Sequence, residues 1–161
     1  MPTIAQREYA VIAAVLLIFA AALVPSLIVA RAEIRDSLRR QDITYLKRSL
    51  EQFYNEHEFY PALPDRDCIT SREPSQWPFI ETLPHDVREG KGFIYRFCIT
   101  STAAAGTNGY YLEAQLEVDQ DDQRTFDEDE LRKFYYRILH EGGKTLYRVC
   151  GGEEKQCETE Y

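Results

Sequence analysis

Four cysteines are the residues of this sequence whose types and spacing suggest covalent chemistry. They lie at positions 68, 98, 150 and 157, all of them after a long apolar segment near the N-terminus. No two of them have CxxC spacing and the three histidines are scattered singly, so a zinc site is poorly supported. An even number of cysteines beyond an apolar span suits two disulfides in an oxidising compartment.

The pairing that we expect joins Cys150 to Cys157, which closes a short terminal loop with the sequence CGGEEKQC. Cys68 and Cys98 are then left to form the second disulfide. Two other connectivities stay open, because spacing alone does not fix the pairing. The alternative is a cytoplasmic domain with four buried free thiols.

An acidic segment over residues 119–130 has some of the spacing of a calcium-binding loop. Loop positions 1, 3, 9 and 12 carry carboxylates, namely Asp119, Asp121, Asp127 and Glu130. Position 6 is Arg124, where such a loop requires glycine. Two interpretations follow: a calcium site, or a solvated acidic loop that caps a short helix at Asp127 to Lys133.

Composition and motifs argue against an enzyme and against a nucleic-acid-binding protein. The sequence has no Ser/His/Asp, Cys/His or P-loop arrangement, and its paired carboxylates lie in charge runs typical of a solvated face. The formal net charge is −8, and residues 61–161 carry twelve basic and twenty acidic side chains. A domain of that sign repels a phosphate backbone. We therefore expect no catalytic site, no nucleic-acid partner and no cofactor other than calcium.

Residues 9–30 (YAVIAAVLLIFAAALVPSLIVA) contain no charged residue. A helix of this length, at about 1.5 Å per residue, crosses a hydrocarbon layer of roughly 30 Å. A cleaved signal peptide is disfavoured by the length of the run and by a preceding basic region of Arg7 alone, and a buried soluble helix would need a larger partner domain. The segment predicts a single-pass membrane protein, with residues 1–30 as its transmembrane part.

The two signals for membrane orientation disagree. Arg31, Arg35, Arg39 and Arg40 follow the span, so the positive-inside rule would place the C-terminal part in the cytoplasm. The cysteines favour the opposite side of the cytoplasmic membrane. We follow the cysteines and predict a domain outside the cytoplasm.

The helix is expected to continue beyond the membrane over residues 31–60. Good helix formers fill this stretch, and proline and glycine are absent before Tyr60–Pro61, which should end the helix. An apolar stripe of helical period runs along one face, at Ile43, Leu46, Leu50, Phe53 and His57. The stripe predicts a helix packed on the core of the soluble domain.

Residues 61–161 are predicted to form the β-sheet domain. Residues 61–92 are rich in proline and read as an irregular connection, with a short helix around Trp77 to Leu83. Two hairpins are expected after it: residues 93–100 with 110–118, and residues 134–139 with 145–149 around Glu141-Gly-Gly-Lys144. The expected fold is α+β, a long N-terminal helix packed on a four-stranded antiparallel sheet.

These parts together resemble type IV pilins and the pseudopilins of type II secretion. That family has a glutamate near the mature N-terminus and a proline seventeen residues later, and Glu8 and Pro25 have this separation. LKRSLEQFYNEHEFYPALP is similar to the end of the long helix in many pseudopilins, and LPHDVREGKGFIYRF and YYLEAQLE resemble segments that enter their sheet. The Cys150–Cys157 loop is similar to the disulfide-closed terminal loop of pilins.

The resemblance implies assembly into a filament through the apolar helix, with other pilin subunits as homo- or hetero-oligomeric partners. It implies that Glu8 pairs with the N-terminal amine of a neighbouring subunit, and that Pro25 loosens the helix during extraction from the bilayer. A prepilin peptidase and an assembly platform are further implied partners. Some pseudopilins bind calcium near their sheet.

Processing of the N-terminus departs from the family pattern. Family precursors carry a basic leader that ends in glycine and is cleaved before N-methylation. Alignment on Glu8 makes Ile4 the first mature residue and puts Thr3 in place of that glycine. The expectation is either an unprocessed relative or a start that omits a leader.

The rival functions are a membrane-tethered binding module that does not polymerise and a small cell-envelope enzyme.

Overall fold

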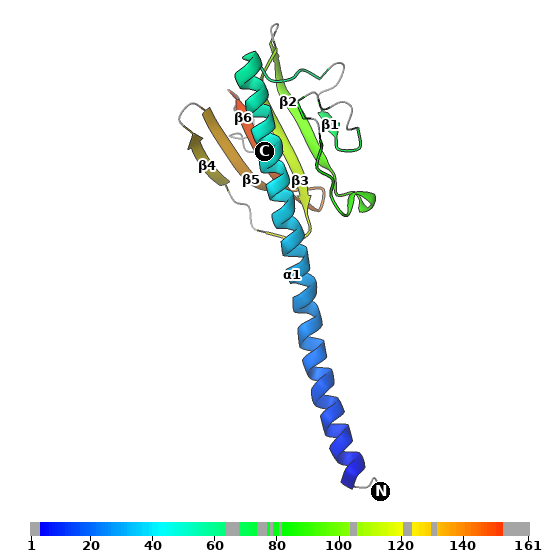
Figure 1. Cartoon of the computed structure of the whole chain (residues 1–161). Coiled ribbons are helices and arrows are strands. Elements are labelled where there is room, and N and C mark those ends of the chain that lie inside the picture. The colour runs from blue at the N-terminus through cyan, green and yellow to red at the C-terminus, as the bar shows by residue number, and fades with distance from the viewer. Residues whose placement is uncertain are drawn as a thin grey trace.

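The protein consists of one long helix and one antiparallel sheet that packs against the C-terminal half of that helix (Figure 1). The computed structural model describes residues 4–63, 68–73, 77, 79–80, 82–103, 106–120, 124–129 and 132–152. The fold is α+β, as predicted.

Helix α1 runs without interruption from Ile4 to His57 and includes Pro25. Its 54 residues give a length of about 80 Å at 1.5 Å per residue. The helix ends at His57, three residues before the end predicted at Tyr60. Glu58 takes the left-handed conformation (φ 65°), and its N–H donates to the Tyr54 carbonyl at 2.7 Å, which closes the last turn.

The sheet contains six strands, not the four predicted, in the order β1-β2-β3-β6-β5-β4, and every neighbouring pair is antiparallel. The two additional strands are the edge strands β1 and β4. The strands span Cys68–Thr70 (β1), Tyr95–Ala103 (β2), Gly106–Leu116 (β3), Arg124–Asp129 (β4), Arg132–Glu141 (β5) and Lys144–Gly152 (β6). A 3-10 turn, η2, covers Glu89–Lys91. The predicted hairpins are confirmed as β2–β3 and β5–β6, the latter turning through Gly142 and Gly143 at positive φ.

Three local predictions are wrong. The acidic segment predicted as a loop with a short helix at Asp127 to Lys133 instead forms β4 and the start of β5. Pairing with the edge of β5 overrides the weak strand propensity of its acids. The residues that the structure describes between Trp77 and Leu83 are not helical, and the predicted loop after residue 100 is largely strand.

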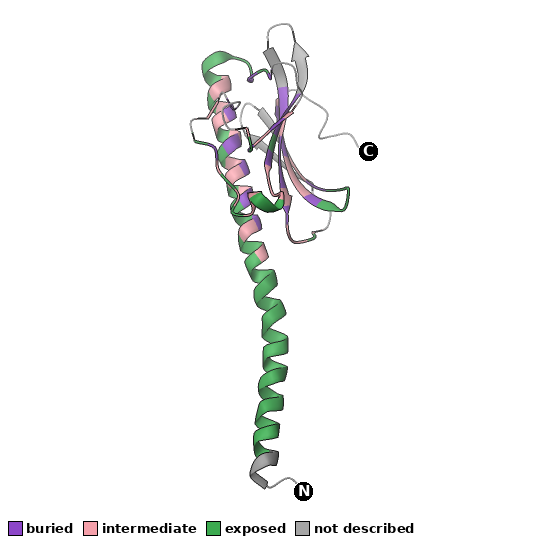
Figure 2. Cartoon of the chain, turned by 90° about the vertical axis from the view of Figure 1, so that its right-hand side faces the viewer, coloured by how far each residue is buried: buried purple, intermediate pink, exposed green. Residues whose placement is uncertain are grey.

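The core lies between α1 and the inner face of the sheet (Figure 2). Ile43, Leu46 and Leu50 of the predicted stripe are fully buried, whereas Phe53 is half-buried and His57 is exposed. The sheet contributes apolar side chains from β2, β3 and β6, among them Phe97, Tyr110, Leu112 and Val149. The stripe therefore fixes which face of the helix meets the sheet.

Glu51 of α1 also holds the helix to the sheet, through hydrogen bonds. Its carboxylate accepts bonds from the hydroxyls of Tyr60 (3.0 Å) and Tyr110 (2.9 Å). Burial, with the nearby Glu51 carboxylate, raises the pKa of Tyr110, which stays protonated as the donor. The Tyr110 ring lies against Gly151 on the neighbouring strand, where an added Cβ would come within 2.7 Å of three ring and hydroxyl atoms.

Replacing Gly151 with alanine should therefore destabilise the protein, because Tyr110 would have to shift in a filled core. We expect Gly151→Ala to lower the free energy of unfolding by about 1–3 kcal/mol, measured by urea denaturation of the full chain in detergent with Trp77 fluorescence. The control is Gly90→Ala, since Gly90 has open space around its Cα. Equal stability of the two variants would contradict the packing described.

Candidate assembly site

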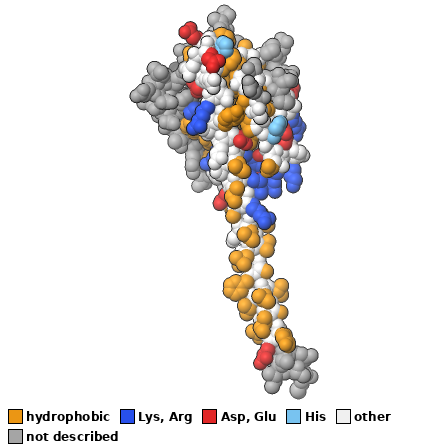
Figure 3. All heavy atoms as spheres, viewed as in Figure 1, with side chains coloured by type: hydrophobic (Ala, Val, Ile, Leu, Met, Phe, Trp, Pro, Cys, Tyr) orange, Lys and Arg blue, Asp and Glu red, His pale blue; other side chains and the backbone are white. Residues whose placement is uncertain are grey.

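The N-terminal half of α1 projects from the domain and contacts no other part of the described chain. Residues 8–31 are all exposed (Figure 2). Large apolar side chains cover the face of this half that Figure 3 shows. Consecutive exposed apolar residues place such side chains on every side of the helix, and they include Val15, Leu16, Leu17, Ile18, Phe19, Leu23, Leu27 and Ile28. A helix of this kind is long and apolar enough to cross a membrane. Its surface requires a bilayer or other apolar helices around it.

Glu8 and Pro25, the two residues that carry the pilin resemblance, both lie on this projecting half. Glu8 is an exposed carboxylate at its outer end, about 26 Å from Pro25 along the helix axis. Pro25 has no N–H for the carbonyl of Ala21, yet α1 stays helical through it. The next residue, Ser26, donates its hydroxyl to the Ala22 carbonyl at 3.3 Å.

The projecting half meets the domain at a group of six charged side chains, which we call the junction cluster. It consists of Arg35, Asp36, Arg39, Asp86, Arg88 and Glu117. Three arginines and three carboxylates give it a formal charge of zero. It lies at the end of the domain where the apolar half of α1 enters it.

Arg39 is the centre of the junction cluster, and its side chain is only 1% exposed. Its guanidinium bonds to Asp36 (2.6 Å), to Glu117 (2.7 Å) and to Asp86, and it stacks over the Phe93 ring at 4.2 Å. Burial opposes the charged form, but the hydrogen bonds to Asp86 and Glu117 outweigh it and raise the pKa of Arg39 above its ordinary value. A buried cation with three carboxylate partners joins the helix, the η2 loop and the sheet.

Asp36 and Glu117 complete the junction at the end of strand β3. The Asp36 carboxylate accepts the backbone N–H groups of Glu117 (2.9 Å) and Val118 (2.9 Å), so the helix caps the strand. Glu117 is bonded by Arg35 and Arg88, each at 2.7 Å, as well as by Arg39. The hydrogen bond from Arg35, reinforced by Arg39 against the cost of burial, lowers the pKa of Glu117 to about 2.

Sequence reasoning missed this cluster, because it treated Arg35 and Arg39 as charges flanking the membrane. In the structure Arg31 is exposed, Arg35 and Arg39 belong to the junction cluster, and Arg40 bonds to Gln120. A signal was present: Asp36 and Arg39 extend the spacing of the apolar stripe, seven and four residues before Ile43. Charged residues at core positions of a helix call for buried partners.

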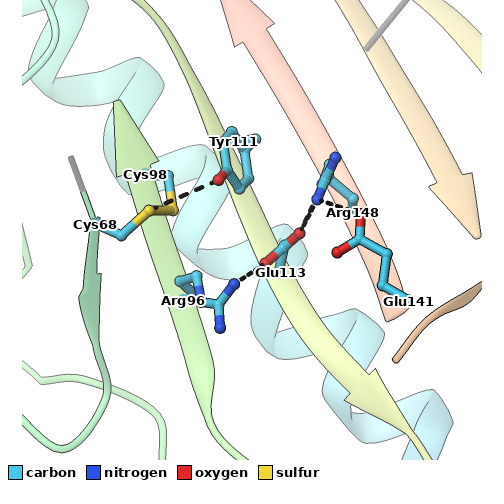
Figure 4. Close-up of a disulfide and its surroundings, with 7 residues drawn as sticks. All are labelled: Cys68, Arg96, Cys98, Tyr111, Glu113, Glu141 and Arg148. Atoms are coloured by element: carbon cyan, nitrogen blue, oxygen red, sulfur yellow. Dashed lines mark hydrogen bonds and ion pairs between the residues drawn. A yellow bond between two sulfur atoms is a disulfide. The ribbon is translucent and has the colours of Figure 1, made fainter. Parts of the chain in front are cut away.

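The predicted disulfide between Cys68 and Cys98 is present, across β1 and β2. It lies on the face of the sheet opposite α1, next to Tyr111 and to Glu113, which is paired with Arg96 and Arg148 (Figure 4). Closing a loop of this size stabilises a fold by about 3–4 kcal/mol in the chain-entropy account. Cys150 is also disulfide-bonded, while Cys157 lies outside the described residues.

The two predicted calcium ligands that the structure describes, Asp119 and Asp127, do not lie on one loop. Asp119 follows β3, Asp127 lies in β4, and Asp121 and Glu130 lie outside the described residues. Asp119 instead bonds to His140 (2.7 Å) and Thr145 (2.9 Å), which lowers the pKa of its carboxyl. Within the described part of the chain, no three His, Cys, Asp or Glu side chains gather in a geometry that could hold a metal ion.

Comparisons with protein-family models, curated proteins and solved structures found no match to this chain. The functional argument therefore depends on the helix and the junction cluster themselves.

Removing the central cation should strongly destabilise the domain, because Asp36, Asp86 and Glu117 would remain buried without it. We expect Arg39→Met to lower the free energy of unfolding by about 3–5 kcal/mol, measured by urea denaturation of the full chain in detergent. Arg48→Met is the matched control, since Arg48 is exposed on the same helix and should change stability by less than about 0.5 kcal/mol. Similar losses in both variants would refute a special role for Arg39.

The lowered pKa of Glu117 predicts acid sensitivity of the junction. Because the folded-state pKa is depressed, the stability that Glu117 contributes is complete above its unfolded pKa of about 4.5 and is lost as the pH falls toward about 2. Unfolding free energies measured across this range should fall more steeply for the natural chain than for Glu117→Gln. Parallel curves for the two proteins would show that Glu117 is not linked to folding in this way.

Proposed function

We propose that this chain is a structural subunit, major or minor, of a type IV pilus-like or type II secretion filament, and that it assembles through the apolar half of α1. The observation that supports this most directly is the state of that half: apolar around its circumference, exposed, and continuous with the helix that packs on the sheet. The Glu8–Pro25 spacing of the resemblance falls on the same segment.

The physical basis of assembly is an exchange of one apolar environment for another. The projecting half is covered by lipid before assembly and by the same half of neighbouring subunits afterwards, so its apolar surface stays out of water in both states. Packing between the helices then supplies the free energy that favours the assembled state over the lipid-covered state. The filament consequently needs no new apolar surface on the domain.

Glu8 is the residue that gives this packing a defined register. A carboxylate enclosed by apolar helices is costly unless a cation pairs with it. The N-terminal amine of an adjacent subunit, the partner implied by the resemblance, would supply that cation. Only one axial offset between helices satisfies both groups, so the pair selects the stagger between subunits.

The junction cluster makes the helix and domain move together. Arg39 and Asp36 connect α1 to the η2 loop and to the end of β3, so force applied to the helix reaches the sheet through buried ion pairs and the packed stripe. Pro25 leaves room for local adjustment within the apolar half. In this proposal the domain lies outside the cytoplasm, where the disulfides are stable, and a prepilin peptidase and an assembly platform act on the subunit.

Replacing Glu8 with alanine should abolish assembly without unfolding the domain. We expect Glu8→Ala to reduce the amount of the chain in sheared filament fractions by at least about tenfold, as loss of a buried charge pair is worth several kcal/mol. Glu33→Ala is the matched control, because Glu33 is an exposed acid on the same helix beyond the apolar half. Disulfide formation and thermal unfolding report on folding.

Normal incorporation of Glu8→Ala would contradict the filament proposal. That result would favour the alternative, a tethered extracytoplasmic binding module, which uses the same helix only as an anchor. Mass spectrometry of the N-terminus provides a second distinction, because a cleaved and methylated first residue is expected only of a processed filament subunit.

A further inference from the structure

The end of the domain nearest the apolar helix carries exposed cations, although the chain as a whole is acidic. Figure 3 shows Lys and Arg side chains gathered there, beside the C-terminal end of the apolar segment. Arg31 on α1 and Lys91 of η2 are exposed, and Arg88 has a 36% exposed side chain. Val87, which precedes Arg88 in the same loop, is an apolar side chain that is 79% exposed.

The junction cluster explains why this end is positive on its outside. Its carboxylates are turned inward, with side chains 3%, 4% and 7% exposed for Asp36, Asp86 and Glu117. Of their arginine partners, Arg35 and Arg88 are more exposed, at 20% and 36%. The exposed or half-exposed acids nearby include Glu33 on α1 and Glu89, which accepts a hydrogen bond from Ser71. Asp119 is also exposed there, but its carboxylate bonds to His140 and Thr145.

The length of α1 fixes how far this end lies from a bilayer that contains residues 9–30. Arg35 and Arg39, which bond to the domain, are about 8 and 14 Å beyond Ala30 along the helix axis. Lipid headgroups occupy roughly the first 5–8 Å beyond the hydrocarbon. The η2 loop, bonded to Arg39 through Asp86, is thus within about a Debye length of the headgroups at physiological salt.

We infer that Arg31, Arg88, Lys91 and Val87 form a lipid-contacting patch that holds the membrane-inserted subunit against anionic headgroups. The inference rests on the membrane-inserted state of the proposed function but not on polymerisation. Cations at this distance attract anionic lipids, and Val87 enters the headgroup layer as an apolar contact. Because α1 is one continuous helix joined rigidly to the sheet, contact on the η2 side sets the tilt of the whole subunit before extraction.

Lysine footprinting of the full chain in lipid nanodiscs tests this inference. Acetylation rates are measured in phosphatidylcholine discs and in discs containing an equal amount of phosphatidylglycerol. We expect Lys91 to react at least about fivefold more slowly in the anionic discs, with high salt restoring its rate. Lys47, about 25 Å beyond Ala30 on α1, is the internal reference and should not change.

Variants separate a specific patch from general attraction. We expect Arg31→Gln to reduce the ratio of docked to undocked domain, read from the protection of Lys91, by about fivefold. The attraction of one cation to an anionic surface changes a binding equilibrium by about this factor. Arg48→Gln, an exposed arginine farther along α1, should leave Lys91 protection unchanged. Lys144 begins β6 directly after the β5–β6 turn, which lies away from α1 in Figure 2, and we expect Lys144 to stay reactive.

Equal Lys91 rates in the two kinds of disc would overturn the inference, and so would protection of Lys144 in place of Lys91. Either result leaves the filament proposal standing, since Glu8-dependent assembly is measured separately. A chain that does not enter the discs at all would refute membrane insertion, and the lipid contact with it.

Discussion

Arg39 is a charged side chain with almost no access to water, and three carboxylates from separate segments converge on it. Asp36 comes from the same helix, Asp86 from the loop before η2 and Glu117 from the end of β3. If any one of these segments moved away, a buried charge would lose its partner at a cost of several kcal/mol. The position of α1 on the sheet, and therefore the direction in which its apolar half projects, depends on this cluster.

The sequence allowed the main elements to be predicted, because their signals are local. The uncharged run, the stripe at Ile43, Leu46 and Leu50 and the Gly142–Gly143 turn each specify structure through neighbouring residues. Strand β4 and the junction cluster could not be predicted in the same way. The acids of β4 pair only because β5 offers an edge, and Arg39 meets Asp86 and Glu117 from 47 and 78 residues away.

The candidate site was likewise predicted only in part from the sequence. Glu8 and Pro25 were identified from their separation alone, and both lie on the exposed apolar half of α1. Among the described residues, neither has a contact outside the helix. What the structure adds is the rigid connection between that half and the domain. For a filament subunit this connection transmits force and fixes the domain's orientation, whereas for a simple tether a flexible linker would be sufficient.

The central claim is that the apolar half of α1 packs against other subunits. A photo-crosslinking amino acid at Leu17, whose side chain is 70% exposed, tests this directly when the chain is expressed in cells that assemble filaments. We predict protein adducts with copies of this chain or other pilin subunits in the sheared filament fraction, and no such adducts from the same crosslinker at Arg48. Adducts to lipid alone, with the chain absent from sheared filaments, would contradict the account.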